Sequence, residues 1–401
     1  MSMTTERRYD IDALRVIAFG LLILYHCGMF YVADWDWHIK SRYLSVALQE
    51  PMRFTNQWRM SLLFVISGLA ISFIWQRYSP GELARKRLWR LGLPLIFGMA
   101  VTVAPQPYYQ ALAAGIIEPG FFKFWGQYLT FHDFPGEAWG GENRVVWTWN
   151  HLWYLPYVLF YTLLLALIGT VLPRAVTGAQ VAFQQLRGPA IMIAPLVLLM
   201  VYGNFVFPHF PYIDHGLTND GYAHALYGTL FLLGFLIGRD PGIWNSICSW
   251  RWFWLGLGLV SYPLLRFQEL WVGDEPTLVL EQLSFLNIYV NRLSWIFALL
   301  AFSYTLLNRP LPGLSYATAA VFPWYVLHQT ITVTAGYELA QLELGPVLEP
   351  LLVVTLTLLG CAVLYECVIR RVPGLAVLFG GPVRSEPKPQ AATLSTSRPD
   401  G

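Results

Sequence analysis

Residues 11–32 read IDALRVIAFGLLILYHCGMFYV, an apolar run long enough to cross a bilayer. The run still carries two ionisable side chains, Arg15 near its start and His26 deep inside it. An ionisable side chain within a membrane-spanning helix is costly, so it indicates a functional site by default. Eleven positions along a helix amount to about three turns, or roughly 16 Å, and return almost to the same direction. We therefore expect Arg15 and His26 to share a face that looks into protein and not into lipid.

The composition is that of an integral membrane protein. Hydrophobic residues make up 56% of the 401 residues and charged residues only 12%, whereas a soluble globular chain carries about 25% charged residues. The net charge of +2 gives no reason to expect nucleic acid as a partner. No pair of cysteines has the spacing of a metal site, and we expect the four cysteines to be small buried side chains: Cys27, Cys248, Cys361 and Cys367.

Apolar runs of about 20 residues recur along the chain and predict an all-α integral membrane protein with about ten transmembrane helices. The runs lie at roughly 11–32, 58–76, 88–106, 151–172, 189–207, 222–238, 252–267, 285–307, 317–337 and 350–370. No fixed-period repeat is visible, which counts against repeat-built transporters. We predict a transmembrane domain over residues 1–380 and a disordered cytoplasmic tail over residues 381–401, which are rich in Pro, Ser, Thr and Lys.

The basic residues predict how the chain is oriented. With the N-terminus placed in the cytoplasm, most of the 26 Lys and Arg residues fall on the cytoplasmic side. The positive-inside rule therefore predicts that both termini are cytoplasmic. The outside segment Tyr108 to Asn150 is rich in aromatic residues, so we expect it to lie at the outer membrane interface, where it could cover or line an acceptor site. These residues are Phe121, Phe122, Phe124, Trp125, Trp139, Trp147 and Trp149.

His26 is the candidate catalytic residue. At about 1.5 Å per residue it lies roughly 22 Å from the inner boundary, where a neutral imidazole could act as a general base. A histidine that only bridges two helices is the alternative. Asp12 and Arg15, at i and i+3, can pair across one turn on the stripe of His26. Their alternative role is to anchor the helix at the cytoplasmic interface.

Arg87 and Arg90 are candidate phosphate ligands. They face the same way at i and i+3, and their guanidinium groups suit phosphate oxygens. A basic cluster at a cytoplasmic helix end is also what the topology rule predicts without any ligand.

Further polar residues are expected at similar depth, and together they predict a polar chamber within the bundle. They are Arg59, His151 beside Trp153, and His328. The stretch Phe64 to Gly68 carries small residues that permit close helix approach. For each polar residue taken singly, a structural hydrogen bond is the alternative to a role in catalysis.

This ordered set of residues resembles the acyltransferase-3 family of membrane acyltransferases. The resemblance covers about residues 8–380 and rests on Arg15 and His26, on Phe64 to Gly68, on Arg87 and Arg90, and on Tyr325 to Gln329. It implies an acyl-CoA donor, a carbohydrate hydroxyl as acceptor, and His26 as the catalytic residue. It also implies a multi-pass location in the bacterial inner membrane.

Within the family the chain looks most similar to a branch that succinylates periplasmic glucans. The similarity lies in Phe54 to Arg59 and in Asn150 to Tyr154. Many family members carry paired glutamates after the equivalent of Trp153, whereas this chain continues with Tyr154, Leu155 and Pro156. A role assigned to those glutamates therefore does not transfer to this chain.

The residues and the resemblance together give a provisional site. His26, Asp12 and Arg15 are expected to be catalytic, and Arg15, Arg87 and Arg90 to hold the phosphates of acyl-CoA as a co-substrate, with no tightly bound cofactor or metal. Arg59, His151, Trp153 and His328 are expected to bind substrate. If the acyl group is a dicarboxylate, Arg59 or Arg292 could hold its free carboxylate.

Two other classes of function compete with this interpretation. Many helices around a polar chamber would also suit a transporter or flippase for a saccharide, and a structural or sensory membrane subunit would explain the loops and the tail. The sequence leaves open the oligomeric state, the identity of the acyl group and acceptor, and the choice between direct transfer and an acyl-enzyme.

Overall fold

The computed structural model describes residues 7–136, 144–271 and 277–381. Within these ranges the chain folds into a bundle of helices, and its one pair of described strands is an antiparallel β1 (Asp133–Phe134) and β2 (Arg144–Val145). The prediction of an all-α class is therefore confirmed apart from this short pairing. Trp139 and all but the first residue of the tail expected over residues 381–401 lie outside the described residues.

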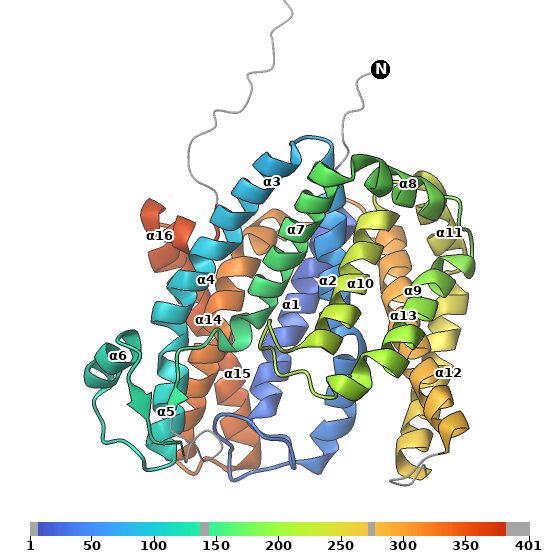
Figure 1. Ribbon diagram of the computed structural model, residues 1–401. Helices are drawn as coiled ribbons and strands as arrows, with labels where there is room; N and C mark the ends of the chain where they lie inside the picture. The colour runs from blue at the N-terminus through green and yellow to red at the C-terminus, as the bar shows by residue number, and fades with distance from the viewer. Residues whose placement is uncertain (1–6, 137–143, 272–276, 382–401) are drawn as a thin grey trace, which may run out of the picture.

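The α-helices are numbered along the chain (Figure 1). They are α1 Tyr9–Met29, α2 Gln49–Trp75, α3 Pro80–Arg87, α4 Leu93–Phe97, α5 Pro105–Ala113, α6 Phe121–Leu129, α7 Tyr154–Val171, α8 Pro173–Phe183, α9 Ala190–Phe205, α10 Gly221–Ile237, α11 Pro241–Ser249, α12 Arg251–Trp271, α13 Leu278–Leu307, α14 Leu314–Ala340, α15 Gly345–Val363 and α16 Pro373–Leu378. Three short segments are π-helical: η2 Leu88–Gly92, η3 Gly98–Val103 and η7 Leu364–Ile369. Three are 3₁₀-helical: η1 Val46–Leu48, η5 Asn150–Trp153 and η6 Phe207–His209.

Seven helical segments in the described part of the chain are long and apolar enough to cross a membrane. They are Tyr9–Met29, Val46–Trp75, Pro80–Ala113, Asn150–Val171, Ala190–His209, Leu278–Leu307 and Gly345–Ile369. The pair α10 and α11 meets the same criterion only jointly and is bent by 111°. The expected spans at 252–267 and 317–337 fall on α12 and α14, which are helical but do not meet it. The count of ten spans therefore stays a prediction.

The two ends of the described chain lie at the same end of the bundle. The start of α1 and the helix α16 both lie in the upper part of Figure 1. We call the end where α1 begins the near end and the opposite end, which holds the loop after α1, the far end. This agrees with termini on one side of a membrane, and their cytoplasmic location stays a prediction.

Local capping explains where two near-end helices begin. The Ser79 side chain accepts from the backbone of Glu82, and the Glu82 side chain accepts from the backbone of Ser79, which together form a capping box before α3. The Asp240 side chain accepts from the backbone N–H of Ile243 at the start of α11. Proline follows the cap in both helices, where its missing N–H costs nothing.

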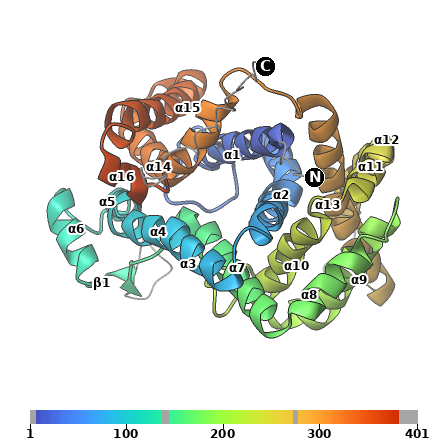
Figure 2. The ribbon, with the colours of Figure 1, turned by 90° about the horizontal axis from the view of Figure 1, so that it is seen from above.

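The core of the bundle is formed around α1 and α2. Helix α1 packs against α2, α13 and α14 (Figure 2). Helix α2 crosses α10 so closely that a Cβ at Gly68 would lie 1.9 Å from the Phe231 carbonyl oxygen. A Cβ at Gly234 would lie 2.0 Å from the carbonyl oxygen of Val65. The close approach predicted from the Phe64 to Gly68 stretch is therefore confirmed.

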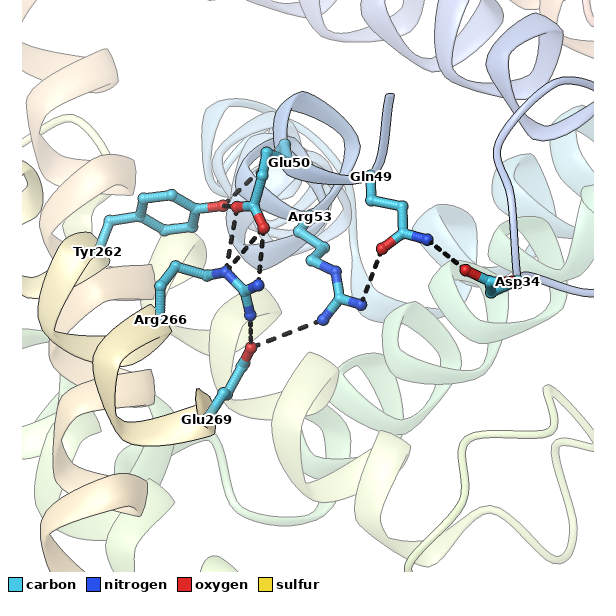
Figure 3. A network of polar contacts seen from close by, with 7 residues as sticks. All are labelled: Asp34, Gln49, Glu50, Arg53, Tyr262, Arg266 and Glu269. Atoms are coloured by element: carbon cyan, nitrogen blue, oxygen red, sulfur yellow. Dashed lines mark hydrogen bonds and ion pairs between the residues drawn. The ribbon is translucent and has the colours of Figure 1, made fainter. Parts of the chain in front are cut away.

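Charged side chains join α2 and α12 at the far end (Figure 3). The Arg266 guanidinium pairs with Glu50 at 2.6 Å and also contacts Glu269, while Arg53 pairs with Glu269 at 3.6 Å. Tyr262 donates to the Glu50 carboxylate at 3.2 Å. Exposed pairs of this kind contribute little each, so the network mainly fixes how the two helix ends meet.

The aromatic segment before α7 lies at the edge of the bundle. Helix α6 is peripheral in both views, and Phe122 is 80% exposed. The segment is anchored by Trp125 and Tyr128, which donate to carbonyl oxygens of η3 at 2.7 and 2.8 Å. An exposed phenylalanine on an amphipathic helix suits a membrane interface.

Two of the four cysteines follow the sequence prediction. Cys27 and Cys361 are buried, and Cys27 contacts Thr332 at 3.7 Å, one turn of α14 from the residue that His26 contacts. Cys248 is half-buried, and Cys367 is exposed. The prediction was wrong for Cys367, because η7 presents this residue outward at the end of the bundle.

Candidate active site

Two cavities of about 330 Å³ each lie along the stripe of α1 that carries Arg15 and His26. The first, which we call the Arg pocket, is lined by Arg15, Arg87 and Arg90 and lies toward the near end. The second, the His pocket, is lined by His26 and Arg59 and lies toward the far end. The stripe therefore looks into protein cavities, as the sequence predicted.

His26 contacts His328 in the wall of the His pocket. His26 Nδ1 lies 2.7 Å from His328 Nε2, and His328 Nδ1 lies 2.7 Å from the carbonyl oxygen of Tyr325. A carbonyl oxygen only accepts, so His328 Nδ1 carries the proton and its Nε2 accepts from His26 Nδ1–H. In the neutral pair the lone pair of His26 is therefore on Nε2, the ring nitrogen on the side away from His328.

His328 stands behind His26 and not in the cavity. Its side chain has no exposed surface, and it is absent from the lining of the His pocket. Its expected contact with substrate is thus replaced by a contact with His26. The two residues are 302 positions apart, and no local sequence pattern indicates that they pair.

His151 lines the His pocket, but both of its ring nitrogens are engaged. Its Nε2 donates to the Val326 carbonyl oxygen at 3.2 Å, and its Nδ1 accepts from the Gln106 side chain at 3.2 Å. Its carbonyl oxygen accepts from the Tyr325 hydroxyl at 2.7 Å. His151 therefore joins η5 to α14 and has no free ring nitrogen for proton transfer.

A buried amide network continues behind His151. Gln329 Nε2 donates to Gln106 Oε1 at 3.1 Å and to His38 Nε2 at 3.0 Å, and Asn150 also donates to His38 Nε2, at 3.2 Å. His38 Nδ1 donates to Gln110 at 2.7 Å. Burial lowers the pKa of His38, which lies in the loop after α1. A neutral His38 is what this set of hydrogen bonds requires.

Arg59 is the charged side chain of the His pocket. It is 3% exposed, and its guanidinium carbon lies 3.5 Å from the centre of the Tyr25 ring. Its Nε and Nη1 atoms have no hydrogen-bond partner among the described residues. Arg292, the other candidate for a carboxylate, donates from Nε to the Gln57 carbonyl oxygen at 2.7 Å and does not line this cavity.

Two stacked aromatic side chains, Trp153 and His215, line the His pocket, and the sequence predicted only the first. Trp153 was expected at the site, and its ring stacks on His215 with centroids 4.0 Å apart. His215 comes from the loop before α10, and burial lowers its pKa. None of the described residues of the aromatic segment 108–149 lines this cavity. Trp149 of the segment nevertheless donates to the carbonyl oxygen of His215 at 2.9 Å, and residues 137–143 lie outside the described residues. That the segment Tyr108 to Asn150 covers or lines an acceptor site therefore stays a prediction.

The Arg pocket gathers three guanidinium groups from two segments of the chain. Arg15 comes from α1, Arg87 from the end of α3 and Arg90 from the π-helix η2. Asp12 pairs with Arg15 at 3.7 Å and with Arg7 at 2.8 Å, and it lines neither pocket. At 1.5 Å per residue Asp12 lies about 21 Å from His26 along α1, so it can orient Arg15 but cannot contact the imidazole.

An aromatic seam separates the two pockets. The ring of Phe19 lies edge-on to Tyr154 at 6.2 Å and to Tyr325 at 5.2 Å, measured between centroids. Tyr154 lines the Arg pocket and Tyr325 the His pocket. A molecule that reaches from one pocket to the other must pass these three rings.

Comparison with known proteins agrees with this architecture. The model of an acyltransferase domain matches residues 8–366, which is nearly the whole chain. Glucans biosynthesis protein C of Escherichia coli strain K12 / DH10B is 24% identical over 392 residues, which cover 94% of this chain and 95% of the relative. The protein of the same name from Salmonella gallinarum is 23% identical over 398 residues, which cover 96% and 98%.

No solved structure matches the chain. The family match nevertheless spans α1 to η7 and includes every residue that lines the two pockets. The chain therefore belongs to the acyltransferase-3 family of membrane acyltransferases and is an acyl-transferring enzyme of the membrane.

Proposed function

We propose that the protein is an O-acyltransferase of the bacterial inner membrane that moves an acyl group, favoured to be succinyl, from acyl-CoA to a saccharide hydroxyl on the other side. In this proposal about ten helices span the membrane and both termini face the cytoplasm. The near end then receives the donor, and the far end opens to the acceptor.

The observation that carries the proposal is that His26 lines a cavity with Nδ1 held by His328, while its Nε2 has no hydrogen-bond partner among the described residues. An acceptor hydroxyl in the His pocket gives its proton to His26 Nε2, and its oxygen attacks the thioester carbonyl carbon. The resulting imidazolium is stabilised by the hydrogen bond from Nδ1–H to His328 Nε2. The carbon–sulfur bond then breaks, and the leaving thiolate takes the proton from His26.

The Arg pocket supplies the other half of the reaction. Three arginines without a lining carboxylate suit the phosphates of CoA. The pantetheine arm would then pass the seam of Phe19, Tyr154 and Tyr325 and bring the thioester to His26.

The acceptor side is supported by aromatic surface at the mouth of the His pocket. Trp153 and Tyr227 line this cavity and offer flat apolar faces, and Asn56 offers hydrogen bonds. Relatives named glucans biosynthesis protein C support a glucan as the acceptor class.

The test is transfer by purified protein in lipid, given labelled succinyl-CoA on one side and a glucan on the other. We expect His26→Ala to lower transfer about 1,000-fold because the general base is lost, while binding of the CoA thioester is kept. His209→Ala, at an exposed position in η6 outside the cavity, is the matched control.

Two results would contradict the proposal. Transfer by His26→Ala at the parental rate would require another base. Movement of intact glucan across the bilayer without transfer of label would favour a transporter. A labelled protein isolated before glucan is added would favour an acyl-enzyme over direct transfer.

A further inference from the structure

His215 is an imidazole of the His pocket that takes no part in the proposed proton transfer. It reaches the cavity from the loop between α9 and α10. Its backbone is hydrogen-bonded, but neither ring nitrogen has a partner among the described residues, and neither is buried. In His151, by contrast, both ring nitrogens are engaged within the protein. His215 therefore offers hydrogen bonds at the cavity that the described part of the chain leaves open.

The backbone of His215 is held in a conformation that side chains rarely adopt. Its φ is +61°, in the left-handed region, and Leu217 two residues later has a φ of +59°. The N–H of His215 donates to Asp220 Oδ2 at 3.1 Å, and its carbonyl oxygen accepts from Trp149 at 2.9 Å. Residues persist in this conformation only where the surrounding structure fixes them, and they cluster at functional sites.

A buried network fixes the loop to α7 and to the start of α10. Asp220 has no exposed surface, and its Oδ2 also accepts from the Tyr157 hydroxyl at 2.6 Å. The Tyr157 hydroxyl in turn accepts from the Leu217 N–H at 3.1 Å. The imidazole of His215 lies against Trp153, with ring planes 28° apart. The ring is therefore positioned before any substrate binds, which lowers the entropy cost of binding.

The direction of α10 indicates which substrate His215 meets. Tyr227 stacks on Phe64, and a Cβ at Gly238 would lie 3.7 Å from Ser72, so α10 runs parallel to α2. Helix α2 begins at the far end, and the loop that precedes α10 therefore also lies toward the far end. In the proposed function the far end admits the acceptor, whereas the donor arrives from the near end.

A saccharide hydroxyl matches the groups that His215 presents. Burial lowers the pKa of His215, so near neutral pH one ring nitrogen donates a hydrogen bond and the other accepts one. A hydroxyl can both donate and accept, whereas a thioester carbonyl only accepts and an apolar acyl chain does neither. The acceptor is therefore the substrate that can use either nitrogen.

We propose that His215 binds a hydroxyl of the saccharide acceptor through a ring nitrogen, so that the loop 213–220 determines how tightly the acceptor binds. The inference rests on the proposed function. It assigns His215 to acceptor binding and leaves proton transfer to His26.

The test measures steady-state transfer of labelled succinyl from succinyl-CoA to a glucan by protein in lipid. His215→Phe keeps a flat ring for stacking on Trp153 but removes both ring nitrogens. We expect the KM for the glucan to rise about 10-fold because a hydrogen bond to the acceptor is lost. The kcat at saturating glucan and the KM for succinyl-CoA should change less than about 3-fold, which also shows that the variant is folded.

Two amide variants test the role of the ring nitrogens. The side-chain amide of asparagine lies close to the place of Nδ1, and that of glutamine lies close to the place of Nε2. His215→Asn or His215→Gln should therefore recover part of the loss. His209→Phe makes the same change at an exposed position of η6, outside the cavity, and should behave as the parent.

The outcomes separate this inference from the proposed function. If the parent transfers no label, the proposed function fails and the inference fails with it. If the parent is active and His215→Phe keeps the parental KM for the glucan, the acceptor does not bind His215. A rise in the KM for succinyl-CoA would mean that His215 contacts the donor, and a fall in kcat at constant KM would mean that it takes part in proton transfer. A loss that neither amide variant recovers would come from the shape of the ring. Each of the last four results overturns the inference and leaves the acyltransferase in place.

Discussion

The Arg pocket and the His pocket have the same volume, about 330 Å³, but opposite chemical character. Three arginines line the first, and Arg90 is exposed. The second contains one buried arginine, with aromatic rings and imidazoles around it. The three charges of the first pocket are suited to holding phosphates in contact with solvent, whereas the second pocket holds the imidazole that is suited to moving a proton.

The same helices build both pockets. Helix α1 contributes Arg15 to one and His26 to the other, and α2 contributes Ser67 and Arg59. Binding and chemistry are therefore kept apart by the aromatic seam and not by separate domains. A substitution where two shared helices cross should therefore impair both donor binding and acyl transfer. A substitution within one pocket should impair only one of these two steps.

The largest effect is expected where α2 crosses α10. Gly68→Ala would place a methyl group 1.9 Å from the backbone oxygen of Phe231, which cannot move without shifting α10. We expect a loss of about 3 kcal/mol in the free energy of unfolding and a loss of both CoA binding and transfer, measured by thermal unfolding and by donor binding in detergent. Gly20→Ala on α1 meets nothing within 4 Å and should be neutral or stabilising. If Gly68→Ala loses transfer but still binds CoA, the crossing of α2 and α10 does not support both pockets.

A smaller effect is expected within the Arg pocket. Arg87→Gln should raise the KM for succinyl-CoA about 10-fold and leave kcat nearly unchanged, because it removes a phosphate contact and no group at the reaction centre. Arg85→Gln, an exposed arginine of α3 outside the pocket, is the control. The succinyl thioester of pantetheine, which lacks the nucleotide, should not distinguish parent from Arg87→Gln. A fall in kcat at constant KM would contradict the division of roles.

The sequence predicted which face of α1 carries the site, but it did not predict which residues from other helices contact that face. Arg15 and His26 could be placed on one protein-facing stripe because helical periodicity is local, and Gly68 could be placed at a close crossing because its missing side chain is visible in the sequence. The pairing of His26 with His328 joins helices 302 residues apart, and no local pattern encodes it. That Nε and Nη1 of Arg59 have no hydrogen-bond partner in the described part of the chain is likewise a property of the packed bundle.

The errors of the sequence interpretation have the same origin. Helix α6 of the aromatic segment Tyr108 to Asn150 lies at the edge of the bundle, but aromatic content alone does not indicate which surface a segment packs against. The loop that does reach the His pocket carries His215, whose role depends on stacking against Trp153 from another part of the chain. Asp12 shares the stripe of His26, but the rise of the helix puts it too far away to act on it.

The smallest effect is expected from a fall in pH, which should destabilise the surroundings of the His pocket more than those of the Arg pocket. Burial lowers the pKa of His38 below its ordinary value of 6.5, so the unfolded chain binds more protons than the folded protein as the pH falls through that range. Stability contributed by neutral His38 is thus present above pH 6.5 and is lost below it, by at most about 1.4 kcal/mol per pH unit.

His38 accepts hydrogen bonds from Gln329 and Asn150, which lie next to the residues that line the His pocket. Protonation of His38 should therefore destabilise this pocket first. We expect the Tm of the parent to fall between pH 7.5 and 5.5 and the Tm of His38→Gln to fall less, with His132→Gln at an exposed position behaving as the parent. The arginines of the Arg pocket stay charged over the same range. Equal slopes in parent and His38→Gln would mean that the amide network tolerates a charged ring, and would contradict a neutral His38.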